Sequence, residues 1–278
     1  MLNGKTGNDI LPEFTNFYSN VFKPNTDNSD DKFRAELGSL LSEHMQSAAP
    51  SVPRIDVIDM LILMGRLKRR KAAGIDGLVS EHIIYGGEQL AVHLCMLFNA
   101  LLMHSYVPSD FHMGINVPLL KNKHGDATQL EMYRGNTISP VWSKLFELVL
   151  LNLFETHFTS DELQFGFKKK SSCSHALFAF NESIRYFTSN QTKVYAAFLD
   201  ASKAFDKVLH NALFVKLLRR NVPVCFVLLL IKWYSQLQCC VRCKINLVTA
   251  FLFYVAFDKE EFCLHVYLLF MWTSGRPN

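Results

Sequence analysis

The chain has 278 residues, of which 49% are hydrophobic and 19% charged, and its formal net charge is +4. An apolar fraction of this size can form a packed core, which excludes disorder of the whole chain. So small a net charge permits a nucleic-acid partner without requiring one. The longest apolar stretches (224–231, 245–257 and 262–272) are each too short to cross a bilayer, so we expect no membrane partner.

The expected compartment is intracellular. The first residues lack a basic segment followed by an apolar run, so no secretory signal is predicted. Seven cysteines, an odd number, fit free thiols in a reducing compartment better than disulfides. Cys240 and Cys243 have a CxxC spacing, but no second ligand pair at zinc spacing accompanies them, so we predict no zinc site.

Asn, Asp, Ser and Pro are frequent in residues 1–52, which predicts a loosely packed lead-in with one helix around Lys32 to Met45. Beyond it, apolar residues at helical spacing predict a second helix, which runs into a basic stretch and then a turn at Gly74 and Gly77. The apolar positions are Val57, Ile58, Leu61, Met64 and Leu67. The basic residues are Arg66, Lys68, Arg69, Arg70 and Lys71.

A further amphipathic helix is predicted from Leu90 to Leu102, and a short strand from Ile115 to Leu120. The strand ends in Lys121, and a turn then leads into a second strand. The sequence therefore predicts a β-hairpin that carries basic residues. Pro140 opens another helix, whose apolar residues from Trp142 to Leu153 recur every three or four positions and share one side.

The apolar run VYAAFL at 194–199 has the length of a buried strand, and it ends in Asp200. A helix is predicted before it, around Ala176 to Ile184, and another after it, from Phe205 to an end at Arg219 and Arg220, before Pro223. A carboxylate at the end of a buried strand can ligate a metal ion. An Asp in this position is more often a helix N-cap, and the residues alone favour the cap.

Four segments, taken in order, carry a family resemblance. They are KAAGIDGL at 71–78, VPLLKNKHGDATQLEMYRGNTISPVWSKLFE at 117–147, LQFGFKKKSSCSHALF at 163–178 and FLDASKAFDKVLH at 198–210. In this order they resemble the opening fingers motif, the fingers hairpin with its Tyr-Arg signature, the Gln-x-Gly-Phe motif and the first palm motif of LINE-type reverse transcriptases. The resemblance covers roughly residues 55 to 243 and is to non-LTR retrotransposons of the jockey-like kind.

The resemblance implies an α/β fold, namely an incomplete right-hand polymerase fold with helical fingers, the first part of the palm and a truncated palm sheet. It divides the chain into an N-terminal lead-in (1–53), a fingers region (54–190), the first part of the palm (191–243) and a divergent tail (244–278). A truncated sheet leaves an edge strand with unpaired backbone N–H and C=O groups, which can pair with another chain and cause aggregation.

The resemblance also implies a reaction and its ligands. The intact family is an RNA-directed DNA polymerase, in which two Mg²⁺ ions stabilise in-line phosphoryl transfer. Asp200 would be the catalytic metal ligand, and the backbone carbonyl of Ala201 a further ligand beside the nucleotide. Phe205 would crowd the sugar 2′ position, although a core aromatic on a helix is nearly as good an interpretation. Lys121 and Arg134 would bind the deoxynucleoside triphosphate, whereas an isolated Arg is usually a solvated surface group.

An RNA template and a DNA primer would contact a second group of residues. Gly74, Asp76 and Gly77 would form a tight turn near the template, and Gln164 and Gly166 would line the template side. A Gly pair with an Asp is equally an ordinary turn.

The sequence departs from the family after Cys243. The family continues with a Gly-rich loop and a strand hairpin that bears paired Asp residues, and residues 244–278 contain neither. We therefore interpret the tail as frameshifted or mispredicted and expect an inactive fragment, because metal ligands act as a unit. Gly135 and Asn136 also replace the Pro-Ile that commonly follows the Arg, so the hairpin geometry is expected to differ.

Two other functions stay open. One is a non-catalytic nucleic-acid-binding remnant that uses the basic fingers surface, which salt-dependent RNA binding without polymerisation would distinguish. The other, ranked last, is a membrane-associated protein built on the apolar tail, which detergent-dependent solubility would favour. Family analogy alone suggests action in the nucleus or the cytoplasm, and the sequence does not predict an oligomeric state.

Overall fold

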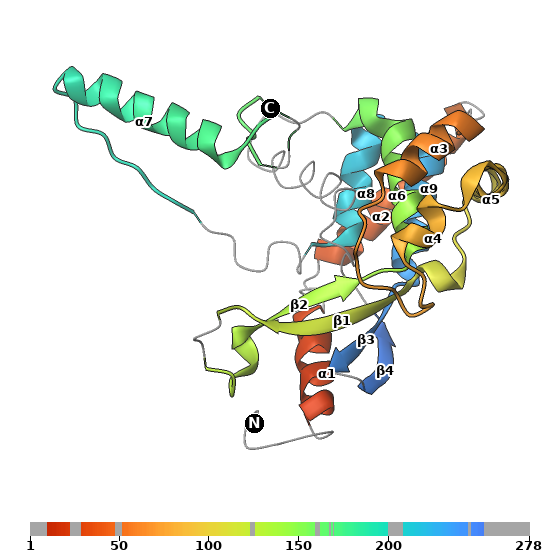
Figure 1. The fold of residues 1–278 in the computed structure, drawn as a ribbon. Helices are drawn as coiled ribbons and strands as arrows, with labels where there is room; N and C mark the ends of the chain where they lie inside the picture. Colours follow the sequence, from red (N-terminus) through yellow and green to blue (C-terminus); the bar gives the residue numbers. More distant parts are fainter. Residues whose placement is uncertain are drawn as a thin grey trace.

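The computed structural model describes residues 10–22, 29–47, 52–122, 126–158, 162–166, 168, 170–199, 208–243 and 246–252. Within these residues, helices and one mixed sheet make up the fold (Figure 1). The α-helices are α1 (Ile10–Val21), α2 (Ser29–Ser47), α3 (Val57–Arg66), α4 (Ser80–Ile84), α5 (Gly87–His104), α6 (Val141–Phe154), α7 (Cys173–Ser189), α8 (His210–Arg219) and α9 (Val224–Ser235). Short 3-10 helices are η2 (Ser109–Phe111), η3 (Leu130–Met132) and η4 (Glu155–His157). The strands are β1 (Met113–Leu120), β2 (Tyr133–Ile138), β3 (Gln238–Cys243) and β4 (Asn246–Leu252).

The sheet has the strand order β2-β1-β3-β4. Strands β1 and β2 form an antiparallel hairpin, with Ile115 opposite Ile138 at one end and Leu120 opposite Tyr133 at the other. Strand β3 lies parallel to β1, and β4 is antiparallel to β3. The parallel pair joins strands separated by a long helical connection, as parallel pairing requires.

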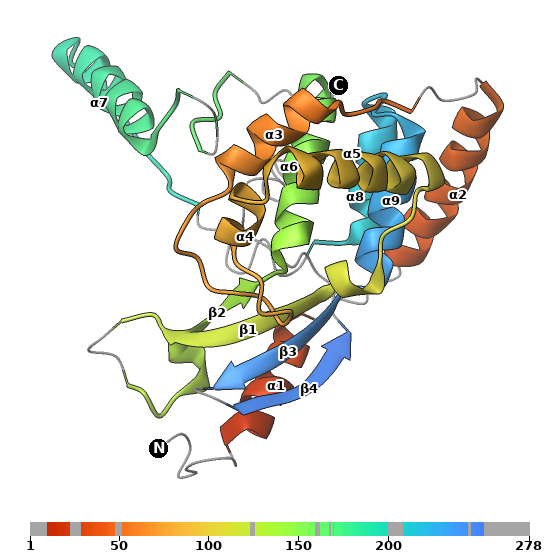
Figure 2. The same cartoon turned by 45° about the vertical axis from the view of Figure 1, so that its right-hand side comes forward.

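The helical layer lies above one end of the sheet, with α3, α5, α6, α8 and α9 gathered together in both views (Figures 1 and 2). Aromatic rings fill its centre. The ring of Phe146 lies 4.9 Å from that of Phe98 and 5.5 Å from that of Trp233, measured between centroids, and Phe98 and Phe146 are fully buried. These three rings tie α5, α6 and α9 into one core, because buried aromatic side chains remove large apolar areas from water.

Helix α1 packs against the sheet, where it contacts β3 and β4 (Figure 2). Its buried residues Leu11, Phe14 and Tyr18 recur at spacings of three and four, so they share one helical face. The interpretation of residues 1–52 as loosely packed was therefore wrong for this stretch. Asn, Asp, Ser and Pro are frequent in residues 1–52 as a whole, and that composition does not reveal the apolar face of α1.

Helix α3 confirms the helix predicted from Val57, and Asp56 caps it by accepting a hydrogen bond from the Asp59 amide at 2.7 Å. Its buried face differs from the predicted one, however. Met60, Leu63 and Met64 are buried, whereas Ile58 is 70% exposed.

The other predicted helices and the hairpin are confirmed. They are α2, α5, α6, α7 and the β1–β2 pair. Helix α8 ends at Arg219, before Pro223, as predicted, but it begins only at His210, and the preceding Val208 and Leu209 are not helical.

The buried strand predicted at 194–199 is wrong. These residues form no strand, and Tyr195, Phe198 and Leu199 are 89%, 81% and 99% exposed. A strand is stabilised by a hydrogen-bonded neighbour, and the place parallel to β1 is filled by β3. The segment instead accompanies α7, which stands apart from the helical layer in both views and buries no residue of its own (Figures 1 and 2).

Among the described helices, none combines the length and the apolar character needed to span a bilayer.

Candidate functional site

The β1–β2 hairpin brings two predicted phosphate-binding residues onto one face. Arg134 lies directly opposite Leu119, and residues directly opposite each other in an antiparallel pair point to the same side. Lys121 follows Leu119 by two residues and so points to that side as well. Lys121 and Arg134 are thus diagonal neighbours, and both are exposed.

The two cations differ in their contacts. The Lys121 ammonium donates a hydrogen bond to the Glu131 carbonyl at 2.7 Å, and the Lys121 amide donates one to the Met132 carbonyl at 2.8 Å. Within the described part of the chain, the Arg134 guanidinium has no hydrogen-bond or charged partner, so all of its donors face solvent. A planar fork of donors in this state can bind phosphate oxygens in a bidentate way.

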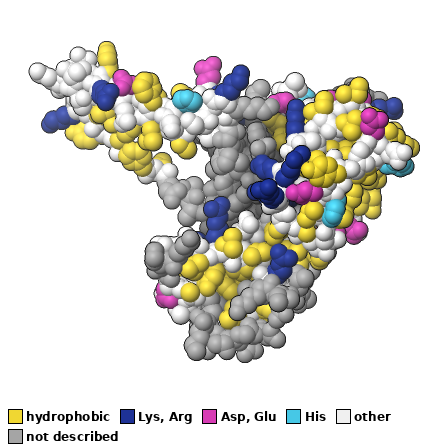
Figure 3. Space-filling view, in the orientation of Figure 1, with side chains coloured by type: hydrophobic (Ala, Val, Ile, Leu, Met, Phe, Trp, Pro, Cys, Tyr) yellow, Lys and Arg dark blue, Asp and Glu magenta, His cyan; other side chains and the backbone are white. Residues whose placement is uncertain are grey.

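A second basic surface lies on the connection between α3 and α4. We define the basic loop as Arg66, Lys68, Arg69, Arg70 and Lys71, and all five side chains are exposed. Dark blue side chains gather beside this connection in the centre of Figure 3. Exposed cations at this density attract a polyanion, and the attraction is screened by salt.

The basic loop has a fixed path. The Arg70 amide donates a hydrogen bond to Glu81 Oε1 at 2.7 Å while Arg70 adopts a positive φ of 57°. That hydrogen bond, and to a lesser degree the charge of Arg69, holds the pKa of Glu81 below its usual value. The Arg69 guanidinium lies over the Tyr85 ring, 5.6 Å from its centroid.

The turn predicted at Gly74 and Gly77 is confirmed. The Gly77 amide donates to the Gly74 carbonyl at 3.3 Å, and Asp76 Oδ1 accepts from the Leu78 amide at 3.1 Å. Gly77 has a φ of +73°, which favours glycine. A Cβ at Gly74 would lie 3.0 Å from the Pro140 Cα, so this turn is pressed against the start of α6.

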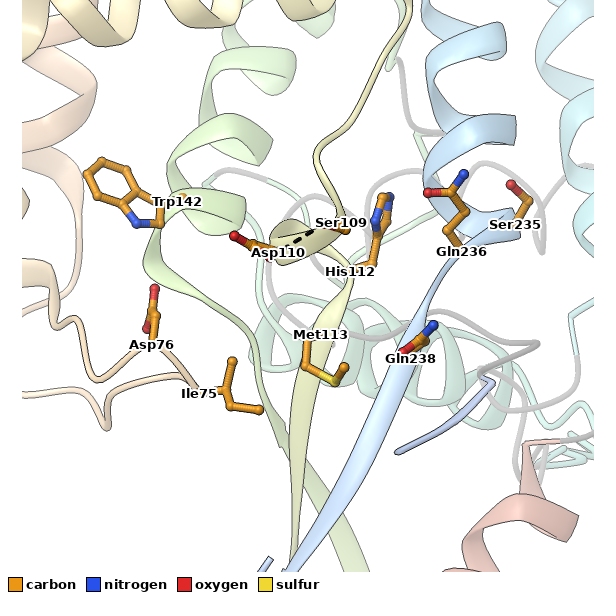
Figure 4. Close-up of a pocket in the computed structure, with 10 residues that line it drawn as sticks. All are labelled: Ile75, Asp76, Ser109, Asp110, His112, Met113, Trp142, Ser235, Gln236 and Gln238. Atoms are coloured by element: carbon orange, nitrogen blue, oxygen red, sulfur yellow. Dashed lines mark hydrogen bonds between the residues drawn. The ribbon is translucent and has the colours of Figure 1, made fainter. Parts of the chain in front are cut away.

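A pocket of about 630 Å³ opens beside this turn (Figure 4). Its lining comes from the turn, η2, the first residues of β1 and β3, and the ends of α6 and α9. The lining residues are Ile75, Asp76, Ser109, Asp110, His112, Met113, Trp142, Ser235, Gln236 and Gln238. Figure 4 shows Trp142, Asp76 and Asp110 near one another at one end and Gln236 at the other, with His112 between.

The chemistry of this pocket differs from that of the two basic surfaces. No Lys or Arg is among its lining residues, and Asp76 and Asp110 contribute carboxylates, so it does not suit a phosphate group. Burial lowers the pKa of His112, an effect that the backbone of Ser109 only partly opposes, and so favours the neutral ring. The Trp142 indole can stack on an unpaired base, and the Gln and Ser side chains of the lining can hydrogen-bond to it.

Gln164 and Gly166 lie in the loop between η4 and α7. Gln164 is 5% exposed, and its Nε2 donates a hydrogen bond to the Gly166 carbonyl at 3.1 Å. Its amide therefore stabilises the loop itself.

The predicted palm residues Asp200, Ala201 and Phe205 lie outside the described residues. Across the part of the chain that the structure describes, no group of three or more His, Cys, Asp or Glu side chains is close enough to hold a metal ion. Metal binding by Asp200 and Ala201 therefore stays a prediction.

Sequence reasoning missed three features of this region: the contact of α1 with the hairpin, the pocket, and the contribution of His112 and Trp142 to it. The helical spacing of Leu11, Phe14 and Tyr18 could have revealed α1. No local signal marks the pocket, because its residues come from segments far apart in the chain.

Comparison with known proteins points to enzymes of mobile elements. No protein-family model matches the chain. It is 27% identical over 206 residues to the RNA-directed DNA polymerase from mobile element jockey of Drosophila funebris, which covers 70% of this chain and 22% of the relative. It is 27% identical over 161 residues to a 115 kDa protein of the type-1 retrotransposable element R1DM of Drosophila melanogaster, and this match covers 58% of this chain and 16% of the relative. A probable RNA-directed DNA polymerase from transposon X-element of the same species is 24% identical over 213 residues, which covers 74% of this chain and 23% of the relative.

These relatives confirm the resemblance found in the motifs. The chain is thus similar over part of its length to RNA-directed DNA polymerases of mobile elements. The relatives come from non-LTR retrotransposons, as the motifs indicated. It spans between 16% and 23% of the length of these three relatives.

Proposed function

We propose that this chain forms the fingers and the first part of the palm of an RNA-directed DNA polymerase, in an incomplete right-hand fold, and binds a deoxynucleoside triphosphate and an RNA–DNA duplex. One observation carries the proposal: Lys121 and Arg134 share the exposed face of the β1–β2 hairpin. The relationship to the jockey polymerase supports it, since that protein is an RNA-directed DNA polymerase.

Each basic surface has its own role in this proposal. On the hairpin, the Arg134 guanidinium grips triphosphate oxygens and the Lys121 ammonium adds a point charge beside it. The basic loop contacts the phosphates of the template strand. Next to the loop, the turn from Gly74 to Gly77 and the pocket beside it face the template bases, and the Gln164–Gly166 loop supports the template side.

Catalysis would need a metal centre. Mg²⁺, when bound by the palm of the intact family, stabilises charge on the attacking and leaving oxygens. In this chain the predicted ligands are Asp200 and the Ala201 carbonyl, and no Asp-Asp pair follows them. We therefore expect residues 1–278 by themselves to bind substrates without extending a primer.

Fluorescence anisotropy with a labelled deoxynucleoside triphosphate tests the hairpin. The double variant Lys121→Gln/Arg134→Gln should weaken this binding, because it removes both cations that would contact the triphosphate. Arg34→Gln, which removes an exposed cation from α2, is the matched control and should leave the affinity for the nucleotide unchanged. Equal behaviour of the two variants would reject the hairpin as a phosphate-binding surface.

A non-catalytic nucleic-acid-binding remnant is the second candidate function, and the exposed basic loop favours it. In that case Arg69→Gln/Lys71→Gln would abolish RNA binding, and the unaltered chain would not bind the deoxynucleoside triphosphate. A primer-extension assay separates the two functions further. Template-dependent synthesis by residues 1–278 would rule out the remnant and contradict the expected inactivity.

A further inference from the structure

The two neighbours of Arg134 along β2 point to the opposite side of the hairpin. Tyr133 pairs with Leu120 and Gly135 pairs with Pro118, and side chains alternate along a strand. This opposite side is the one that α1 covers. Arg134 is thus an exposed residue between two residues that contact the apolar face of α1.

Tyr133 is held by Phe14 of α1. Their ring centroids are 4.9 Å apart with the planes inclined at 79°, which is an edge-to-face contact. Phe14 is 3% exposed, so its ring has little room to move. The Tyr133 hydroxyl also donates a hydrogen bond to the Ala127 carbonyl at 3.0 Å, which fixes the other end of this side chain.

The backbone at Gly135 packs directly against the side chains of Asn116 and Tyr18. A Cβ on Gly135 would lie 2.6 Å from Asn116 Oδ1, 2.8 Å from Asn116 Nδ2 and 3.0 Å from Tyr18 Cε1. Asn116 is fully buried, and Tyr18 is 2% exposed. The absence of a side chain at position 135 therefore lets β2 lie directly against Asn116 and α1.

The Asn116 side chain is unusual in this place. Neither its Oδ1 nor its Nδ2 has a hydrogen-bond partner among the described residues. Burying an unpaired amide is unfavourable, so an apolar residue would stabilise the sheet better. A proline at position 135, where the family commonly has one, would bring a Cβ against Asn116 and would not fit this arrangement.

We propose that α1 is a positioning element for the triphosphate site. Phe14 contacts Tyr133, and Tyr18 contacts Gly135, so α1 fixes the backbone position of β2 on both sides of Arg134. The fixed backbone in turn orients the Arg134 guanidinium toward the phosphates. This inference rests on the proposed function. It assigns Phe14, Tyr18, Asn116 and Gly135 as positioning residues that act through Arg134 without touching the ligand.

Calorimetric titration of residues 1–278 with inorganic tripolyphosphate tests this role. Arg134→Gln should abolish most of the binding. Gly135→Ala should weaken it by about tenfold, since displacing a binding group by about 1 Å is enough for such a loss. Gly65→Ala is the matched control, because a Cβ there has no neighbour within 4 Å, and it should bind like the unaltered chain.

Two further variants separate positioning from a general loss of structure. The double variant Gly135→Ala/Asn116→Ala lacks the Asn116 side-chain amide that the new Cβ would meet. Its affinity for tripolyphosphate should therefore be higher than that of Gly135→Ala alone. Tyr18→Phe keeps the ring carbon that contacts Gly135 and should bind normally, whereas Tyr18→Leu should not. On the Arg134→Gln background, Gly135→Ala should cause no additional loss, because both changes act through one guanidinium.

The outcomes distinguish this inference from the function on which it rests. If the unaltered chain does not bind tripolyphosphate, the triphosphate site and the positioning role are both wrong. If Arg134→Gln abolishes binding but Gly135→Ala and Tyr18→Leu bind as Gly65→Ala does, the site stands and the positioning role is overturned. If Gly135→Ala fails to fold, the Tyr18 variants still test the positioning role. Weaker tripolyphosphate binding in Tyr18→Leu than in Tyr18→Phe supports it, and equal binding overturns it.

Discussion

His210 stacks on Tyr234, with ring centroids 5.0 Å apart and planes inclined by 28°. The contact joins the first turn of α8 to the end of α9, and the Nε2 of His210 is buried without a hydrogen-bond partner among the described residues. Burial lowers the pKa of His210 to about 4. The folded protein thus favours the neutral imidazole.

This contact predicts a pH-dependent stability. The folded pKa lies below the unfolded value of about 6.5, so the unfolded chain binds more protons between these values. The contribution of His210 is complete above about pH 6.5 and is lost as the pH falls toward 4, by up to about 3 kcal/mol. His210→Phe should remove this part of the pH dependence in urea melts, and His93→Gln, an exposed control, should not. An unchanged pH profile in His210→Phe would contradict the assignment.

The aromatic core predicts a large effect of truncation. Phe146 is fully buried between Phe98 and Trp233, so Phe146→Ala should reduce the free energy of unfolding by about 3–5 kcal/mol. Phe178→Ala, on the exposed α7, should change it by no more than about 0.5 kcal/mol. Denaturant melts followed by tryptophan fluorescence measure both values. A similar loss in the two variants would mean that α7 is packed in solution.

Two glycines predict opposite effects of the same substitution. A Cβ at Gly74 would press on the Pro140 backbone at 3.0 Å, so Gly74→Ala should destabilise the protein by about 1 kcal/mol or more. Gly65 lies inside α3 with open space around it, so Gly65→Ala should stabilise by about 0.5–1 kcal/mol. Thermal melts check the two signs. Stabilisation by Gly74→Ala would show that the turn does not depend on its approach to α6.

The charged contact between α2 and α8 predicts a small effect. Arg219 pairs with Glu36, and Asn211 Nδ2 donates a hydrogen bond to Asp30 Oδ1 at 3.0 Å. Because Arg219 is largely exposed, Arg219→Gln should cost about 0–1 kcal/mol and should matter less in high salt. A loss above about 2 kcal/mol in the same melts would contradict this assessment.

Much of the helical layer could be predicted from local pattern, because Leu and Phe at three- and four-residue spacing indicate an amphipathic helix. The hairpin could also be predicted. Its register could not, since the long turn between Lys121 and Tyr133 fixes no pairing by itself. The shared face of Lys121 and Arg134 therefore became visible only in the structure.

The failures have physical causes as well. The run at 194–199 has the composition of a buried strand, but strand formation depends on a partner that composition cannot show. The role of α1 depends on Asn116 and Gly135, which lie about a hundred residues away along the chain. The pocket beside Asp76 likewise forms only where four separate stretches of the chain meet, at 75–76, 109–113, 142 and 235–238.

We propose above all that the exposed hairpin face binds a nucleoside triphosphate. The most direct measurement is the binding of a fluorescent deoxynucleoside triphosphate to residues 1–278 in the presence of Mg²⁺ and an RNA–DNA primer–template. We expect saturable binding that is lost in Arg134→Gln, reduced in Lys121→Gln and unchanged in Arg34→Gln. Absence of saturable binding, or equal affinity in Arg134→Gln and Arg34→Gln, would contradict it.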